Sequence, residues 1–523
     1  MARAAALVLL IFSLMVGDAQ ATQLFHVYVA DGPLPDVSGG AQGLLVPGAG
    51  PETSYAQSLA SLERGEVRNS LRGGLPTGPA LIDVSSLQSE PQRPYILVSL
   101  PRGGTQPNDR RYPVVVVGRG YEGILVSDST RIPGLVSIVD IAPTALGEKG
   151  ALRSQPDDDP AATLRELDSR IDAHNGTRLP ASILAAVLIL ALAVFWPRAG
   201  LLGFGAVLAV NLLLGLAGVS AYWPTVVAIG LAAAAGGPLL ALVLRSDLAI
   251  GLFLAGVVAA YLVVLAVEGT AVALSPFGPT QNARFFGISN LLETMLLVPA
   301  LAGAVYLWRR LGWIGFAAVA VVAFVAIAGN RFGADGGGAI VLAVGFALLA
   351  ALLAGLRGAR LAVAMGAAVV VAGGVVTLDA SVGPSSHVTR AIDSGPSGLL
   401  GDLRDRVELS WERVVHKPSV MVVVAICIPV LVWLVIRVLR SDAPFARRAL
   451  PLAFAAAVGV SLLVNDSPND VLTAGLVGYV AVEAVMLRDR CAALSPSVES
   501  SPGSPSSLPA AAPRRPWPPR PKR

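Results

Sequence analysis

From residue 180 onward the chain consists of long apolar runs separated by short polar breaks. Each run is close to the roughly 20 residues that a helix needs to cross the hydrocarbon core of a bilayer. The pattern therefore predicts about eleven transmembrane helices. Their approximate ranges are 180–196, 199–219, 223–244, 247–267, 291–308, 311–329, 338–355, 360–379, 418–439, 448–465 and 469–487.

Before residue 180, short β-branched runs alternate with turns rich in Gly, Pro and Asp. FHVYVA, RPYILVSLP and RYPVVVVG have the composition and length of strands, and turns of this kind between them are typical of an α/β domain. After these runs Pro160 can open a helix on which Leu164, Leu167 and Ile171 share one face. We expect this helix to lead the chain from an α/β domain down to the bilayer.

The two ends of the chain differ from the parts between them. Residues 1–21 contain an apolar stretch and a small-x-small site at Ala19–Ala21, which is the pattern of a signal peptide, cleaved or retained. This segment would place an extracytoplasmic domain at 22–178, ahead of a transmembrane domain at 179–489. Residues 490–523 are rich in Pro and Ser, and we expect them to form a disordered cytoplasmic tail.

The arginines test this topology independently, because short cytoplasmic loops hold an excess of positive charge. The short outer loops SAY and NDSPN contain no arginine, and the longest outer loop, about 380–417, mixes arginines with acids. Since lysine is scarce beside arginine, the composition is also typical of a GC-rich bacterial genome. We therefore expect a multi-pass protein of the bacterial plasma membrane with its C-terminus inside. The arginines of the predicted inner loops are Arg198, Arg245, Arg309, Arg310, Arg357, Arg360, Arg437, Arg440, Arg447 and Arg448.

Composition supports a membrane location and argues against several classes of function. Hydrophobic residues make up 54% of the 523 residues, whereas soluble proteins are about 45–50% apolar. The net charge of +4 is small, so the lipid bilayer is the expected partner and a nucleic acid is not. Cys427 and Cys491 are the only cysteines, which leaves no disulfide framework or cysteine-rich metal site. Zinc-site and Walker A patterns are also missing, so we expect no metal site and no direct nucleotide-driven pumping, and the sequence indicates no cofactor.

Polar elements interrupt the membrane region at four places, all on the predicted outer side. They are EGTAVALSPFGPTQNARFFGISNLLETM, GNRFGADGGG, LDASVGPSSHVTRAID and VNDSPND. Ionisable groups at membrane depth are costly and by default suggest a functional site. We therefore expect an outward-facing site assembled from all four elements. Its candidate catalytic residues are Glu293, Asp335, His387 and Asp466, and its candidate substrate-binding residues are Arg284, Asn290, Arg331, Ser386, Arg390 and Asn465.

The chemistry of these residue types narrows the choice of substrate. Carboxylates can act as general bases or hold a hard cation, arginines bind phosphate or carboxylate, and a histidine can carry protons near neutral pH. A phosphate-bearing amphiphile at the outer leaflet would suit this set. The same acids would also suit an ion-coupled secondary transporter. Each element alone also has a plain structural interpretation, because Asn, Asp, Ser and Pro cap helices and form turns.

The segment from Tyr112 to Gly147 resembles the C-terminal core of alkaline-phosphatase and sulfatase superfamily domains. It contains a strand, a T-R-x-G-x-V-like turn and a D-x-x-P-T helix start at Asp140, and Asp31 after HVYVA resembles the end of the first metal-bearing strand. The wider arrangement, with GLLVPGAGPETS, ARFFGISNLLE, GADGGG, SSHVTR and VNDS, resembles uncharacterised bacterial polytopic membrane proteins. The second likeness spans most of the chain and implies no particular function.

The superfamily resemblance implies two metals bound by Asp and His residues, with a Ser or Thr nucleophile. The chain departs from that pattern, because residues 22–178 contain only His26 and His174 and no Asp-His pair. Thr53 or Ser54 could lie where the nucleophile does, or simply form a turn. Without its ligands a metal cannot stabilise developing phosphoryl charge, so we expect a shortened, degenerate domain kept for binding or packing.

These observations lead to one leading hypothesis and two alternatives. We expect a cell-envelope membrane protein that binds or processes an anionic substrate, including a lipid-linked one, at the outer face of the membrane. The alternatives are an ion-coupled secondary transporter and a non-catalytic envelope scaffold. The sequence does not decide whether the protein is an enzyme, and the oligomeric state stays open.

Overall fold

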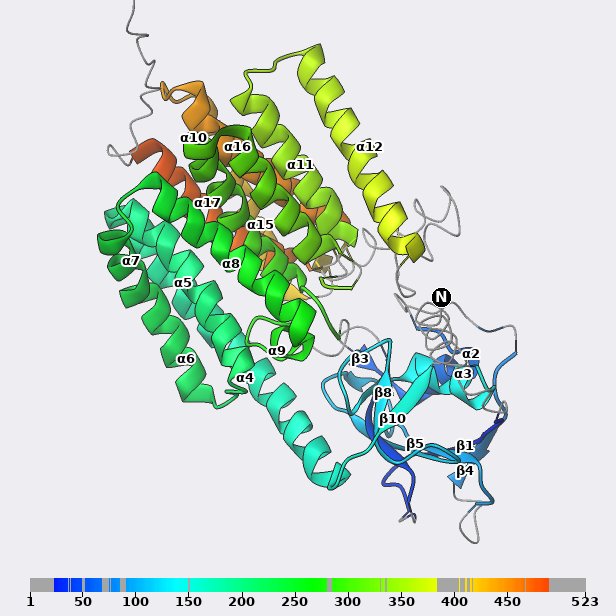
Figure 1. Cartoon of the computed structure of the whole chain (residues 1–523). Coiled ribbons are helices and arrows are strands. Elements are labelled where there is room, and N and C mark those ends of the chain that lie inside the picture. The colour runs from blue at the N-terminus through cyan, green and yellow to red at the C-terminus, as the bar shows by residue number, and fades with distance from the viewer. Residues whose placement is uncertain are drawn as a thin grey trace, which may run out of the picture.

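The chain folds into an N-terminal α/β domain and a helical bundle that meet along one side (Figure 1). In this computed structural model the first described residue is 23 and the last is 488. Between them the gaps are 36, 38, 49–51, 68–74, 76, 85–90, 149–150, 280–284, 330, 334–335, 383–403, 405–409, 412–413, 416 and 466. The predicted signal peptide, the whole of the predicted tail and six candidate site residues lie outside the described residues.

A mixed β-sheet forms the core of the N-terminal domain, with strand order β10-β8-β2-β7-β5-β1-β4 and β9 paired to β2. The three predicted strands lie at its centre, where β1 pairs parallel with β5 and β5 pairs antiparallel with β7. Every residue of β5 is buried, as expected of a strand covered on both faces. The strands are β1 (His26–Ala30), β2 (Ala41–Val46), β3 (Glu52–Thr53), β4 (Leu81–Asp83), β5 (Tyr95–Ser99), β6 (Gln106–Pro107), β7 (Tyr112–Val117), β8 (Gly123–Ser127), β9 (Leu135–Ser137) and β10 (Leu152–Gln155).

Two helices pack on this sheet. Helix α2 (Tyr55–Arg64) begins after Ser54, whose side chain accepts a hydrogen bond from the backbone of Gln57 and so caps the helix. Helix α3 (Ile141–Ala145) is fully buried and follows a 3₁₀ turn, η2 (Ile138–Asp140). The predicted helix start at D-x-x-P-T is therefore confirmed.

Helix α4 (Pro160–Phe195) connects the two parts of the molecule without interruption. It begins at the predicted proline, and the Asp159 carboxylate caps it by accepting from the backbone of Ala162. The leucines and isoleucine predicted to share one face are buried. The first part of this helix lies alongside the α/β domain and the rest joins the bundle (Figure 1).

The bundle contains eight helices in the described part of the chain that are long and apolar enough to cross a membrane. Helices occupy every predicted range, but α11 and α12 contribute shorter apolar stretches, and α10 runs through two predicted spans. The protein is thus a multi-pass helical membrane protein, while eleven crossings remain a prediction. The helices after α4 are α5 (Pro197–Leu216), α6 (Tyr222–Leu231), the π-helical turn η3 (Ala232–Gly236), α7 (Gly237–Val243), α8 (Asp247–Val267), α9 (Gly269–Ala273), α10 (Asn290–Ala328), α11 (Gly336–Leu353), α12 (Ala359–Val382), α15 (Pro418–Leu439), α16 (Phe445–Val464) and α17 (Pro468–Arg488).

Helix α10 contains a sharp break at Gly312, which has φ 64° and ψ −152°. Such a backbone conformation is open to glycine at little cost and to other residues only with strain. The break falls between the predicted spans 291–308 and 311–329, beside Arg309 and Arg310. It therefore marks the predicted turn between two crossings, made here without a loop.

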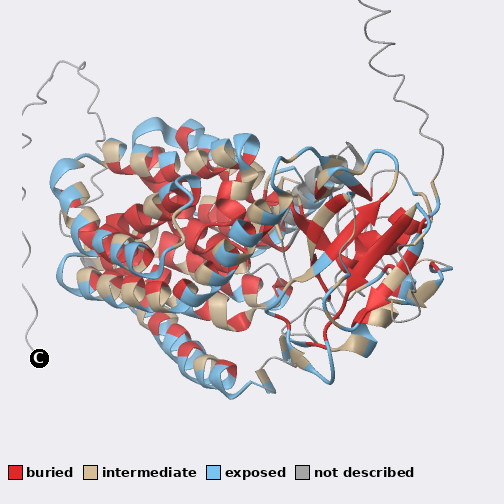
Figure 2. Ribbon diagram, turned by 90° about the horizontal axis from the view of Figure 1, so that it is seen from below, coloured by how far each residue is buried: buried red, intermediate tan, exposed pale blue. Residues whose placement is uncertain are grey.

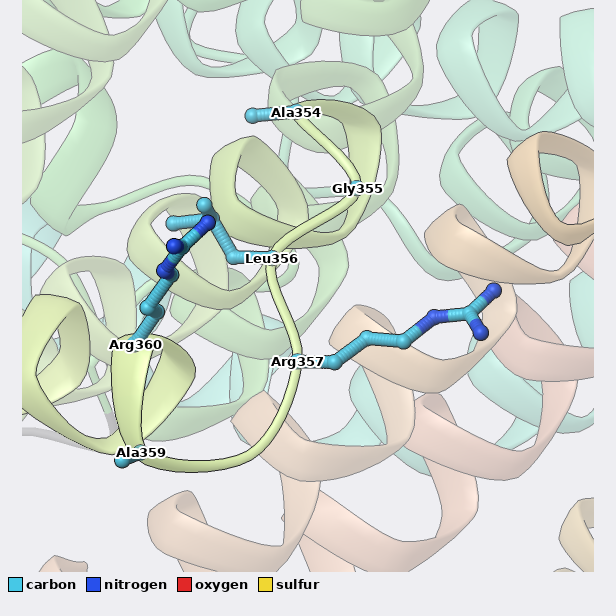
Figure 3. Close-up of a pocket in the computed structure, with 6 residues that line it drawn as sticks. All are labelled: Ala354, Gly355, Leu356, Arg357, Ala359 and Arg360. Carbon is cyan, nitrogen blue, oxygen red and sulfur yellow. The ribbon is translucent and has the colours of Figure 1, made fainter.

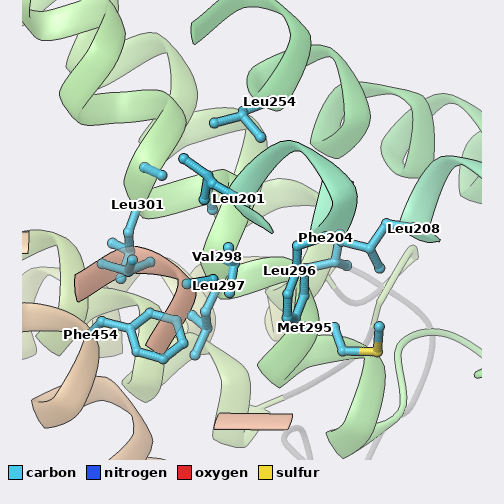
Figure 4. Packing of buried hydrophobic residues seen from close by; sticks show 14 of the residues in the cluster. Leu201, Phe204, Leu208, Leu254, Met295, Leu296, Leu297, Val298, Leu301 and Phe454 are labelled. Carbon is cyan, nitrogen blue, oxygen red and sulfur yellow. The ribbon is translucent and has the colours of Figure 1, made fainter. Parts of the chain in front are cut away.

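Large side chains of α5, α8, α10 and α16 interlock in the centre of the bundle (Figure 4). Figure 2 shows buried residues in the interior of both parts and exposed ones on the outer helix faces. The exposed residues of the bundle include many large apolar ones, such as Ile183, Val187 and Trp433. Lipid-facing helix surfaces have this composition, because lipid tails are as apolar as the side chains.

The α/β domain is attached to the bundle by apolar and charged contacts. A small apolar cluster joins Val46 and Leu135 of the sheet to Ile171 of α4 and to Leu274 after α9. The Arg111 side chain, only 5% exposed, pairs with two aspartates of α4. The domain is therefore packed against the membrane part rather than tethered by a linker.

Candidate functional site

The candidate site lies at the start of α10, on the end of the bundle that faces the α/β domain. Ser289 caps α10 by accepting from the backbone of Leu292, and Asn290 is the first helical residue. Glu293, in the first turn, is completely buried. The predicted pair Asn290 and Glu293 thus stands at a helix start as expected, with Asn290 partly exposed.

The Asn465 side chain meets this glutamate from the junction between α16 and α17. Its amide Nδ2 donates to Glu293 Oε2 at 2.7 Å and to Ser461 Oγ at 2.8 Å. Asn465 is only 2% exposed. Two of the predicted polar elements therefore meet in space, although 172 residues separate them in sequence.

The predicted element around Arg331 also reaches this place. The backbone N–H of Ile288 donates to the carbonyl of Gly333 at 3.2 Å, which links the loop before α10 to the loop before α11. Gly287 has φ +76°, and a Cβ there would lie 2.1 Å from the Gly333 oxygen. The close approach therefore requires glycine. Arg331 itself is exposed.

Contacts from the long predicted outer loop complete the described part of the site. The Ser410 hydroxyl donates to the backbone carbonyl of Asn465 at 2.9 Å. Three of the four predicted elements thus meet at one end of the bundle. The remaining element, LDASVGPSSHVTRAID, lies mostly outside the described residues. The candidate residues that lie outside them are Arg284, Asp335, Ser386, His387, Arg390 and Asp466.

An ion pair that was not predicted lies at the same end of the bundle. Arg178 of α4 lies 3.5 Å from a carboxylate oxygen of Asp470 in α17, and it also donates to the carbonyl of Gly278 at 2.7 Å. Arg178 is the last charged residue of α4 before its apolar part, and Asp470 belongs to the NDSPND stretch. These two positions in the sequence were the available signals for the ion pair.

A buried polar network supports the segment that leads into α10. Asn211 of α5 donates to the Tyr261 hydroxyl at 2.9 Å and to Ser275 Oγ at 3.1 Å, and its carbonyl oxygen accepts from the backbone of Phe277 at 2.9 Å. Ser289 then donates to the Phe277 carbonyl. A single asparagine within the apolar run 199–219 was the only sequence signal. This network satisfies backbone groups of non-helical chain buried in the bundle.

His174 of α4 is buried among these elements with only 7% exposure. Neither ring nitrogen has a hydrogen-bond partner within the described residues. It lies between Arg170 and Arg178 at helical spacing, so the three side chains follow one stripe of α4. Position 174 continues the face of Leu164, Leu167 and Ile171, and this spacing was the available sequence signal for its burial.

A second pair of charges joins α15 to α17, and only its acid is buried. Arg437 donates to Glu483, whose side chain is only 4% exposed, and the Arg437 guanidinium also lies over the ring of Trp433. The sequence analysis placed Arg437 in an inner loop and did not consider Glu483. Buried charges of this kind need a partner, because their desolvation is costly.

A hollow of about 470 Å³ lies in the turn between α11 and α12, at the end of the bundle away from the α/β domain. Figure 3 shows that its two arginines point apart: Arg357 extends toward α16, where it lies over the Phe445 ring, and Arg360 turns back beside Leu356. Two diverging guanidinium groups do not form a chelating anion site. This hollow is also remote from Glu293.

The candidate residues of the α/β domain have structural roles in the described part of the chain. Asp140 is fully buried and accepts hydrogen bonds from the hydroxyls of Ser127 and Ser129 at 2.6 and 2.5 Å. Ser54 caps α2, as the turn-forming interpretation predicts. Among the described residues, no three His, Cys, Asp or Glu side chains come close enough to share a metal ion.

The arrangement can therefore hold one buried carboxylate in a defined orientation beside loops that carry amides, hydroxyls and guanidinium groups. Carboxylates held in this way can accept or release a proton. The exposed Arg331 can attract an anion. Comparisons with protein-family models, with curated proteins and with solved structures give no match, so the argument for function rests on these residues.

Proposed function

We propose that the protein binds an anionic substrate, including a lipid-linked one, at the outer face of a bacterial membrane beneath the α/β domain. The observation that supports this most directly is the hydrogen bond between Asn465 and the buried Glu293. It joins polar elements from distant parts of the chain at the one end of the bundle where the α/β domain sits. A bundle that needed only stability could place apolar residues there, because a buried ionisable group is costly.

The described groups suggest a division of roles. Arg331, exposed at the rim, attracts a phosphate or carboxylate, because a guanidinium offers paired donors to such groups. Asn465 orients the Glu293 carboxylate, which takes or gives a proton. Since Glu293 has no exposed surface, substrate access requires at least one neighbouring loop to move. With these roles the site either only binds the substrate or also transfers a group to or from it.

A binding experiment in lipid nanodiscs tests this proposal. The full-length protein is titrated with phosphatidic acid, a phosphate monoester lipid, and with diacylglycerol of the same chain length, and bound lipid is measured by native mass spectrometry. We expect Arg331→Ala to weaken phosphatidic acid binding by about ten-fold, the loss expected for one charge-assisted contact. Arg357→Ala is the matched control, because it removes an exposed arginine at the opposite end of the bundle.

Two outcomes would contradict the proposal. Equal losses in the Arg331 and Arg357 variants would show only general attraction between arginine and anionic lipid. Equal affinity of the wild-type protein for phosphatidic acid and diacylglycerol would show that the anionic group is not recognised.

A second candidate function, ion-coupled transport, is favoured by the buried Glu483, which is paired with the partly exposed Arg437. Glu293 and Glu483 are buried acids near opposite ends of the bundle. Such acids mark ion pathways in transporters. If the protein is a transporter, solute uptake into proteoliposomes should depend on a proton or sodium gradient, and Glu483→Gln should abolish that dependence. A binding protein would show neither effect.

A further inference from the structure

A cation–π contact joins the α/β domain to the loop that leads into the candidate site. Arg131 lies in the turn between β8 and β9 and has φ 54°. Its guanidinium carbon is 3.9 Å from the ring centroid of Phe286, which precedes α10. Burial lowers the pKa of Arg131, and the nearby Asp128 partly offsets this effect. The guanidinium is thus partly desolvated, a condition under which cation–π attraction is stronger than at a fully hydrated surface.

The residues on either side of Phe286 are held firmly. Phe285 packs against the apolar cluster that includes Ile132 and Leu135 of the domain. Gly287 is in close contact with the carbonyl of Gly333, and Ile288 donates to the same carbonyl. The short loop 285–288 therefore has little freedom to move independently of its neighbours.

This loop leads directly to the buried carboxylate. Ser289 is fixed on both sides, because its hydroxyl donates to the carbonyl of Phe277 and accepts from the backbone of Leu292. The backbone of Glu293 in turn donates to the Ser289 carbonyl at 2.7 Å. A shift of Phe286 would thus move the cap of α10, and with it the glutamate that Asn465 holds.

We propose that Arg131 is a positioning residue: through its contact with Phe286, the α/β domain sets the position of Glu293 and so controls the site in the bundle. The domain acts as a regulator of this site, and any ligand or partner that rearranges the β8–β9 turn changes the site as well. The positioning itself follows from the contacts above. Only its consequence for substrate binding rests on the proposed function.

Hydrogen exchange on the full-length protein in nanodiscs tests the positioning. The variants are Arg131→Ala, Phe286→Leu and the double variant, with Arg102→Ala as a control that removes an arginine with 71% of its side chain exposed in the same domain. We expect the backbone amides of 286–293 to exchange about five-fold faster in either single variant, because a contact of about 1 kcal/mol is lost. The double variant should be no faster than the singles.

Two further measurements separate positioning from a general loss of stability. Exchange in the central strand β5 should stay as in wild type, and Arg131→Lys should recover part of the protection, because a lysine also binds an aromatic face. Unchanged exchange in 286–293 overturns the proposal, and so does an additive double variant. If exchange changes as expected but wild-type protein does not distinguish phosphatidic acid from diacylglycerol, the positioning stands and the proposed substrate class fails.

Discussion

The hydrogen bond between Asn465 and Glu293 allows an unusual prediction, in which a second substitution restores stability that the first one removes. In Asn465→Leu the buried carboxylate loses its amide donor at 2.7 Å while remaining completely buried. A hydrogen bond to a charged group contributes about 1.5–3 kcal/mol to the free energy of unfolding, and the upper part of this range applies where the group is fully buried. We expect this variant to lower the free energy of unfolding by about 3 kcal/mol.

The double variant Glu293→Met with Asn465→Leu should be more stable than Asn465→Leu alone. Replacing both partners by apolar groups of similar shape removes the amide donor and the carboxylate acceptor together. Such a double replacement can leave the free energy of unfolding nearly unchanged. The coupling free energy between the two positions should then be about 2 kcal/mol, within the range seen for directly bonded residues.

The assay is reversible unfolding in mixed micelles of dodecyl maltoside and sodium dodecyl sulfate, followed by helical circular dichroism. Thr473→Ala is the control, since Thr473 is exposed on α17 and surface changes usually stay within about 0.5 kcal/mol. Additive losses in the double variant, within about 0.5 kcal/mol, would refute the reasoning that the two side chains stabilise the bundle as one unit.

Three further predictions concern stability in the same assay. Gly287→Ala should destabilise the protein by about 2 kcal/mol or more, because its backbone has φ +76° and a Cβ would collide with a carbonyl, while Gly269→Ala, with open space around it, should not; equal losses would contradict this. Arg437→Ala should lower the free energy of unfolding by about 1.5–3 kcal/mol, since the buried Glu483 loses the charge-assisted hydrogen bond from this partly exposed arginine, and Glu483→Gln in the same chain should restore part of the loss. His174→Leu should raise the midpoint of thermal unfolding, because it removes a buried imidazole that makes no hydrogen bond within the described residues; a fall would show that the imidazole has a stabilising partner.

The sequence was most informative where a hydrophobic period repeats over a long stretch. The central strands, the helix beginning at Pro160 and the apolar runs of the bundle all occur where they were predicted. The same holds for the helix start at Asn290 and the junction around Asn465. Local pattern determines these elements, since the period of 2 or 3.6 residues decides which face is buried.

The partners across the site could not be predicted in the same way. Nothing in the sequence indicates that Asn465 faces Glu293, because that contact depends on how α10 and α16 pack. Arg178 and Asp470 were missed for the same reason, as was the buried Glu483. The turn between the spans 291–308 and 311–329 was predicted, but its form, a break at Gly312 within a continuous helix, depends on a backbone conformation that the sequence does not give.

Helix α4 has a consequence for how the α/β domain can move. Its 36 residues make a rod about 54 Å long at 1.5 Å per residue, shared between the domain and the first apolar span. A rod of this kind transmits torque, whereas a flexible tether does not. Pro180, inside the helix near the boundary, is the natural place for bending. Any rotation of the domain must therefore tilt or kink the first membrane helix. The position of the domain above the lipid surface is thus coupled to the tilt of that helix.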